Sequence, residues 1–161
     1  MASSRIVQEI QQTQPFTSIE QEVGVAFMKT ADHLRRSMAT AFEAHGVTQQ
    51  QFNVLRILRG AGKAGLPTLS VAERLVEHTP GITRLIDRLE AKDLVRRERP
   101  AEDRRQVYCY IAKDGLALLG RLDGPVASSS KRAFGGLKKA EMTTLLEILE
   151  KIRDAEGCSA S

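Results

Sequence analysis

The chain has 161 residues, of which 42% are hydrophobic and 27% are charged, with a formal net charge of +4 and a pI of about 9.3. This length suits one domain with a normal core, and the mild basic excess favours a polyanionic partner without proving one. No apolar run approaches the roughly 20 residues that a membrane helix needs, and the polar N-terminus lacks the apolar region of a signal peptide. The sequence therefore predicts a cytoplasmic protein that does not enter a membrane.

The residue types that hold metals or form catalytic centres occur here without the spacing that such sites need. Cys109 and Cys158 lie far apart and belong to no Cys-x-x-Cys pair, and His33, His45 and His78 show no metal-ligand spacing. The chain also lacks a glycine-rich phosphate loop, a nucleophile elbow and a His-Glu-x-x-His motif. We therefore predict no metal, no cofactor and no enzymatic activity.

Hydrophobic spacing and capping residues predict two helices in the first third of the chain. Residues 1–17 are expected to be flexible, since the stretch 1–14 is polar and glutamine-rich, and apolar residues at helical spacing then predict a long helix over residues 18–44. Thr48 suits the N-cap of a second helix over residues 49–59. The glycines and the proline of residues 60–67 predict a flexible connection to the next element.

The middle of the chain predicts a helix-turn-helix motif. Thr68 suits the N-cap of a short helix over residues 69–75. Thr79 and Pro80 combine an N-cap hydroxyl with a proline at the first helical position, so we expect the second helix at residues 80–92. The outward face of this second helix is polar and basic, which is typical of a recognition helix.

A β-hairpin is predicted directly after that helix. A strand over residues 94–99 leads to a turn with a doubly basic tip, and the return strand places Cys109 on its apolar side, where it packs as a small hydrophobe. Helix, strand, basic tip and strand is the layout of a winged helix-turn-helix. In that layout the helix enters a major groove of DNA and the tip reaches the neighbouring minor groove.

Two long helices are predicted at the C-terminal end, over residues 113–134 and 139–155, with Pro125 expected to kink or interrupt the first. The second helix carries a narrow apolar stripe of Met142, Leu145, Leu149 and Ile152. Such a stripe suits packing against another helix, including one from a second subunit.

With these motifs in place, the chain resembles the MarR family of regulators over about residues 18–155. The specific parts are the runs 83–90 and 94–97 and the pattern Asp103-x-Arg105-x-Val107 that leads to Gly115. The resemblance implies a mostly α fold with a small β-wing, in which a winged helix-turn-helix domain joins a helical dimerisation domain. The domain boundaries that we expect are 46–112 for the winged domain, 18–45 with 113–155 for the dimerisation domain, and a flexible tail over 156–161.

The resemblance also implies what the protein does. Members bind a near-palindromic operator in double-stranded DNA as homodimers, usually as repressors, and are often released by a small aromatic ligand held between the two domains. The operator and any ligand of this chain cannot be read from its sequence. A non-specific architectural DNA-binding protein is the alternative, which fits the basic charge but fits a dedicated recognition helix less well. A footprint separates the two, because an architectural protein protects no defined half-sites.

The candidate DNA-binding residues lie at the short helix, the start and outer face of the recognition helix, and the wing tip. In full they are Thr68, Thr79, Pro80, Gly81, Thr83, Arg84, Arg88, Asp103, Arg104 and Arg105. Arg84 or Arg88 suits the O6 and N7 atoms of guanine, and Arg105 suits a narrow minor groove with Asp103 holding its guanidinium. The alternative for the wing tip is a solvated ion pair that contributes little. The recognition helix that precedes the tip favours DNA contact over this alternative. For Arg96, Arg97 and Arg99, phosphate contact and a solvated strand remain equally open.

The candidate dimer interface combines the start of the first long helix with the stripe of the last one, namely Phe16, Ile19, Val23, Met142, Leu145, Leu149 and Ile152. The sequence also departs from the family pattern. Asp93 replaces a glycine before the first wing strand, and Ala112 replaces a threonine that caps the helix after the wing. Lys138 stands where the last helix usually has a capping hydroxyl, although Glu141 keeps the acidic half of the capping box.

Overall fold

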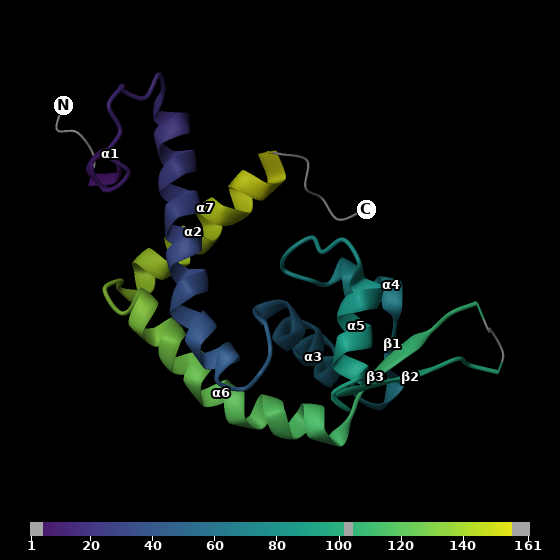
Figure 1. The fold of residues 1–161 in the computed structure, drawn as a ribbon. Helices are drawn as coiled ribbons and strands as arrows, with labels where there is room; N and C mark the ends of the chain where they lie inside the picture. The colour runs from purple at the N-terminus through teal and green to yellow at the C-terminus, as the bar shows by residue number, and fades with distance from the viewer. Residues whose placement is uncertain (1–4, 102–104, 156–161) are drawn as a thin grey trace.

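A computed structural model of the chain describes residues 5–101 and 105–155 (Figure 1). Within these ranges the elements are, in chain order, α1 (Arg5–Glu9), α2 (Ile19–Glu43), α3 (Gln49–Ala61), the 3-10 turn η1 (Gly62–Ala64), β1 (Leu66–Pro67), α4 (Thr68–Glu73), α5 (Ile82–Glu90), β2 (Val95–Glu98), β3 (Tyr108–Ile111), α6 (Lys113–Phe134) and α7 (Lys139–Ala155). The strands form one antiparallel sheet in the order β1-β3-β2. The fold class is therefore the predicted one, mostly helical with a small β-wing. None of the helices in these ranges is long and apolar enough to cross a bilayer.

The hydrophobic core lies where α3, α4, α5, the sheet and the first half of α6 meet. Its fully buried side chains are Val54, Leu55, Leu58, Val71, Ile86, Leu89, Cys109, Leu119 and Leu122. Cys109 is packed as predicted, and burial raises the pKa of its thiol above the ordinary value. This core holds α5 against the sheet, while the β2–β3 hairpin projects away from α2 and α6 (Figure 1).

Side chains cap the starts of α2 and α3, and the cap of α3 is the predicted one. Ser18 caps α2 by accepting the backbone N–H of Gln21. Thr48 caps α3, where its hydroxyl accepts the N–H of Gln51 at 3.2 Å and the Gln51 side chain accepts the N–H of Thr48 at 3.1 Å. Reciprocal bonds of this kind satisfy two donors that a helix start leaves free. They confirm Thr48 as the predicted N-cap of α3.

The predicted cap of α4 is wrong by one residue. Pro67 is the N-cap and Thr68 is already helical. Both the backbone N–H and the hydroxyl of Thr68 donate to the carbonyl of Val107, at 3.0 and 3.1 Å. The reason is β1, which pairs with β3 inside the stretch that we expected to be a flexible connection, and so draws Thr68 toward the wing.

The predicted start of the recognition helix is also wrong. α5 begins at Ile82, not at Pro80, and its N-cap is Gly81 with a left-handed φ of 87° and no side-chain cap. The Thr79 hydroxyl instead donates to the carbonyl of Glu77 at 3.1 Å. A left-handed residue directly before a helix favours glycine, and this glycine replaces the Thr79 cap that local sequence suggested.

One segment is more regular than expected, and one is bent but unbroken. Part of the N-terminal segment expected to be flexible forms α1, which contacts α2 and buries Ile6. α6 continues through Pro125 without interruption, although it bends along its course (Figure 1). Proline removes one N–H donor from the helix and disfavours the preceding turn, but the packing of α6 on α2 and α3 keeps both halves in one helix.

The start of α6 offers a stability prediction. Ala112 is its N-cap and makes no side-chain capping bond, as the departure from the family pattern suggested. Ala112→Thr is expected to raise the free energy of unfolding by about 0.5–2 kcal/mol, because a hydroxyl there accepts a free backbone N–H. The check is urea unfolding of Ala112→Thr beside Ala112→Val, which has the same shape without the hydroxyl. Equal stability of the two variants would show that capping is not the cause.

Candidate nucleic-acid interface

The recognition helix α5 separates its residues into a buried and an exposed face. Leu85, Ile86 and Leu89 are buried in the core. Three of the predicted DNA-binding residues, Thr83, Arg84 and Arg88, are exposed on the opposite face. Pro80 and Gly81 are exposed at the entrance to the helix, and Thr79 is half-buried there. The helix therefore presents hydroxyl and guanidinium donors on a surface that is free to meet a polar partner.

A groove joins this helix to the wing. It has a volume of about 570 Å³ and lies between the start of α4, Thr83 and Ile86 of α5, Arg97 of β2 and the segment 105–107 that precedes β3. Thr68, Thr83 and Arg105 line it together, so the fold brings predicted residues from three separate elements to one place. Asp103 and Arg104 lie outside the described residues, and the predicted pairing of Asp103 with Arg105 stays a prediction.

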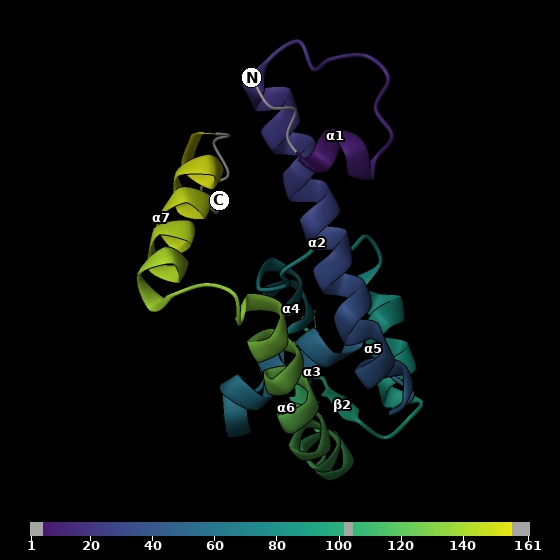
Figure 2. The ribbon, with the colours of Figure 1, turned by 90° about the vertical axis from the view of Figure 1, so that its left-hand side faces the viewer.

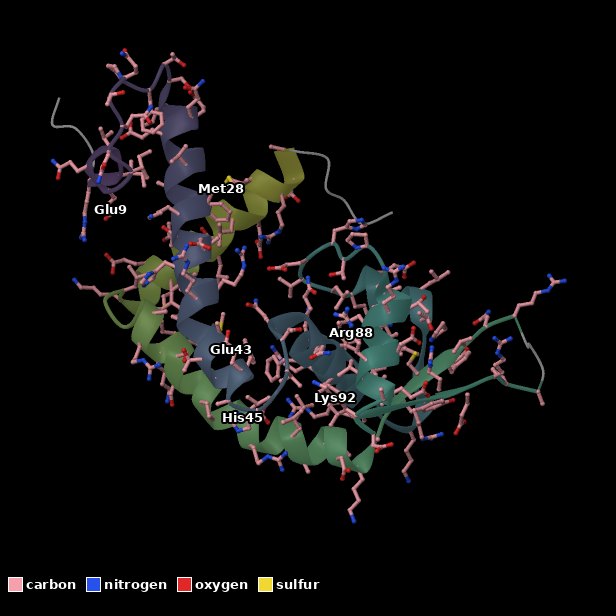
Figure 3. The ribbon with its side chains drawn as sticks, viewed as in Figure 1. Glu9, Met28, Glu43, His45, Arg88 and Lys92 are labelled. Atoms are coloured by element: carbon pink, nitrogen blue, oxygen red, sulfur yellow. The ribbon has the colours of Figure 1, made fainter. Side chains whose placement is uncertain are left out.

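Arg88 belongs to a different part of the surface. It lines a groove of about 590 Å³ with Lys92 and Thr48, on the side of α5 that faces the end of α2 (Figure 3). Lys92 closes that side by donating from Nζ to the carbonyl of Gly46 at 2.5 Å. Arg88 is thus not brought together with Thr83 and Arg105. Arg84 is exposed on α5 but lines neither groove.

Arg97 has a role that the sequence reasoning missed. Its Nε and Nη2 atoms donate to Glu90 Oε2 at 2.8 and 2.5 Å, and its Nη1 atom lies 2.7 Å from Asp87 Oδ1. Its backbone N–H also donates to Glu90 Oε1 at 3.0 Å. Neither phosphate contact nor a solvated strand describes Arg97, because it fastens β2 to α5. It also neutralises two acidic side chains on the recognition helix.

Arg96 points the other way. Its guanidinium lies over the ring of Tyr110, 4.3 Å from the centroid, and it pairs with Glu98. The alternation of the strand explains the difference between neighbours, since Arg96 and Arg97 face opposite sides of the sheet. A signal for the Arg97 contact was present in the sequence, because Asp87 and Glu90 lie one helical turn apart just before a basic strand.

The Arg97 contact predicts a pH dependence of stability. Its hydrogen bond holds the pKa of Glu90 below the ordinary value of 4.5. A lowered pKa means that the pair stabilises the fold above that value and stops doing so as the pH falls through the folded pKa. The free energy of unfolding of Glu90→Gln should therefore lie below that of the wild type near neutral pH, with a gap that narrows as the pH falls below 4.5. Urea unfolding over a series of pH values from neutral downward measures this gap. Glu147→Gln on α7 serves as the control, and a gap for Glu90→Gln that does not change with pH would contradict the prediction.

The predicted dimer residues lie on an apolar surface that the single chain leaves uncovered. None of the residues of α7 is buried, and this helix stands apart from α2 (Figure 2). Ile19, Val23, Met142 and Ile152 are exposed, whereas Phe16, Leu145 and Leu149 are half-buried. The structure adds Phe27, Met28, Leu146 and Ile148 to the exposed set.

A cavity of about 190 Å³ lies between α2, α3, α6 and the loop that precedes α5. Its apolar wall includes Phe42 and Phe52, whose ring centroids are 5.0 Å apart, and Arg56 lies over the Phe52 ring at 5.9 Å. Glu77 and Thr79 contribute the loop side. Glu77 also lies 3.5 Å from Arg35 of α2, so the loop that leads into α5 contacts both the cavity and the long helix. Within the described ranges, no group of His, Cys, Asp or Glu side chains could hold a metal ion.

Comparison with known proteins agrees with this geometry. A model of the MarR family matches residues 47–107. A MarR transcription factor from Planctomyces limnophilus is 36% identical, with 84% of this chain and 98% of that chain covered and a TM-score of 0.65. The homoprotocatechuate degradative operon repressor of Escherichia coli is 28% identical over 107 residues, which are 66% of this chain and 71% of that protein. Sco3205, a MarR family regulator from Streptomyces coelicolor solved in complex with DNA, has a TM-score of 0.78 at 21% identity, with 93% and 94% of the two chains covered.

The chain belongs to the MarR family of DNA-binding transcriptional regulators with a winged helix-turn-helix fold. This is a family of regulators and not of enzymes, in agreement with the motifs that the sequence lacks.

Proposed function

We propose that this protein is a repressor that binds a pseudo-palindromic operator as a homodimer. The observation that carries the proposal is the groove in which Thr83 of the recognition helix and Arg105 of the wing lie together. A helix and a wing placed this way can read adjacent major and minor grooves. In this proposal residues 46–112 bind DNA and residues 18–45 with 113–155 form the dimer. A regulator needs access to the chromosome, which agrees with the expected cytoplasmic location.

The homodimer is supported by the uncovered faces of α2 and α7. Exposed apolar side chains gathered on two helices mark an interaction site in water-soluble domains. A second copy of the chain is the simplest partner for this surface, because a two-fold interface needs only one self-complementary patch. The same symmetry places two recognition helices symmetrically on DNA.

Regulation by a small ligand is supported by the cavity beside α5. Its volume of about 190 Å³ exceeds that of a cavity of about 150 Å³ known to bind benzene, so a single aromatic ring fits. A ligand there contacts the Glu77–Thr79 loop directly ahead of Gly81. We propose that occupancy moves this loop and with it the recognition helix, which releases the DNA.

Selection of bound duplexes from a random DNA pool tests the proposal. We expect one enriched motif made of inverted half-sites about one helical turn apart, with an affinity that falls steeply as salt rises. A motif without an inverted repeat would contradict the symmetric dimer. Enrichment of no motif would favour the architectural alternative.

A further inference from the structure

The groove between α4, α5 and the wing has a position that identifies its occupant. When a recognition helix lies in a major groove and the wing lies in the next minor groove, one sugar-phosphate strand separates them. That strand has to pass between the two protein elements. The groove of about 570 Å³ lined by Thr83 and Arg105 occupies this position, and it is continuous with the surface proposed to read DNA.

The lining of this groove is unusual for a surface that meets only phosphates. Leu69, at the second position of α4, lines the groove and is 73% exposed. Pro67 and Val107 extend the apolar strip. Apolar side chains beside the hydroxyl groups of Ser70 and Thr83 and the guanidinium of Arg105 match a partner that alternates apolar and anionic groups. A deoxyribose-phosphate chain alternates in this way.

We propose that this groove seats one sugar-phosphate strand of the operator and that Leu69 packs against its deoxyribose rings. Ser70, Thr83 and Arg105 then face the phosphates, because hydroxyl and guanidinium groups are the usual phosphate donors. Thr68 has a smaller part than predicted, since its hydroxyl proton is already donated to Val107. This inference rests on the proposed DNA binding. It adds to that proposal a preference for deoxyribose over ribose.

The apolar contact makes Leu69 a specificity residue for the sugar. A ribose places a 2′-hydroxyl at the position where deoxyribose has only C–H, and the 2′-hydroxyl is the group that lets proteins tell the two sugars apart. A hydroxyl pressed against Leu69 loses its water without gaining a protein partner, which costs affinity.

The charge of the groove is not uniform. Glu73 lines it together with Leu69 and Ser70, so the strand passes a carboxylate. Like charges repel across a short distance, and this carboxylate therefore limits affinity for any duplex. Glu73→Gln is expected to tighten binding of preferred and scrambled duplexes by about two- to fivefold. Glu147→Gln on α7 is the matched control, which is expected to bind as the wild type does.

The sugar preference is tested with the selected duplex carrying single ribonucleotides along one half-site. The same positions are substituted in parallel with 2′-fluoro nucleotides, which favour the ribose pucker but carry no hydroxyl. For wild-type protein we expect a few adjacent ribonucleotides, between the major-groove and minor-groove contacts, to weaken binding by roughly 5- to 30-fold. The 2′-fluoro nucleotides at those positions are expected to weaken it by less than about twofold.

Leu69→Ser distinguishes this contact from other effects of ribose. The serine can accept or donate a hydrogen bond, so the ratio of deoxy to ribo affinity should fall to below about twofold. Leu116→Ser, at another exposed leucine outside the groove, should keep the wild-type ratio. Leu69 is exposed, so its replacement leaves the core unchanged.

The outcomes separate this inference from the proposed function. If no duplex is bound by the wild type, the proposed DNA binding itself is wrong. If DNA is bound but ribose costs nothing, or Leu69→Ser keeps the wild-type ratio, the strand does not pack on Leu69 and the inference is overturned. An equal loss with ribo and 2′-fluoro nucleotides would also overturn it, because pucker and not the hydroxyl would then be responsible.

Discussion

A Val23→Glu and Leu146→Glu double variant is expected to be monomeric and to lose operator binding. Val23 is 52% exposed and Leu146 is 62% exposed in the single chain, so neither replacement disturbs the core. In a homodimer each position occurs twice, and an uncompensated carboxylate buried in an interface costs about 3–5 kcal/mol. A dimer of the double variant would bury four such charges. Sedimentation at micromolar concentration and binding to the selected duplex measure the two effects.

The matched control is Thr143→Glu, which adds the same charge to α7 away from its apolar stripe. It is expected to remain dimeric and to bind DNA as the wild type does. If the double variant sediments as a dimer, the exposed faces of α2 and α7 do not form the interface, and the proposed arrangement of the two recognition helices fails with it.

Arg84→Ala and Arg105→Ala are expected to weaken DNA binding in different ways. Arg84→Ala should cost about 1–3 kcal/mol on the selected duplex and relax the choice of base at one or two positions. Arg105→Ala should weaken binding to selected and scrambled duplexes alike. It should also reduce the slope of the logarithm of the binding constant against the logarithm of the salt concentration by about one. The minor groove offers mainly shape and an A·T-versus-G·C distinction, so the wing contributes affinity more than sequence choice.

Titration of both variants on both duplexes at several salt concentrations tests this division. Arg121→Ala, which removes an exposed arginine from α6, is the control and should leave both affinities unchanged. Binding of Arg105→Ala with wild-type affinity to both duplexes would show that the wing does not contact DNA. A uniform loss with Arg84→Ala would assign that residue to the backbone instead of the bases.

The features that the sequence predicted well depend on neighbours along the chain. They include the Thr48 cap of α3, the ends of α6 and α7 and the apolar side of β3, which all follow from spacing within a few residues. The replacement of a usual glycine by Asp93 also marked a real feature, because Asp93 has a left-handed φ of 56°. Aspartate adopts this conformation more readily than most residues, so the turn keeps its backbone conformation although aspartate replaces glycine.

The features that it missed depend on partners far along the chain. Thr68 bonds to Val107 across the sheet, and that contact redirects a residue whose local pattern suggested a cap. Arg97 meets Glu90 and Asp87 only when the wing folds back on α5. Thr79 was misjudged for a related reason, since the backbone at Gly81 decides where α5 starts. Local sequence patterns therefore predict the helices and strands. Tertiary contacts determine which partners the side chains of the site residues bind.

Hydroxyl-radical footprinting of the wild-type protein on its selected duplex tests the central claim most directly. A homodimer with a recognition helix and a wing in each subunit should protect two half-sites related by a two-fold axis, about one helical turn apart. Each half-site should show the backbone between its major-groove and minor-groove contacts protected most strongly, where the strand enters the groove beside Leu69. Uniform protection, or one protected patch without a symmetric counterpart, would contradict the account.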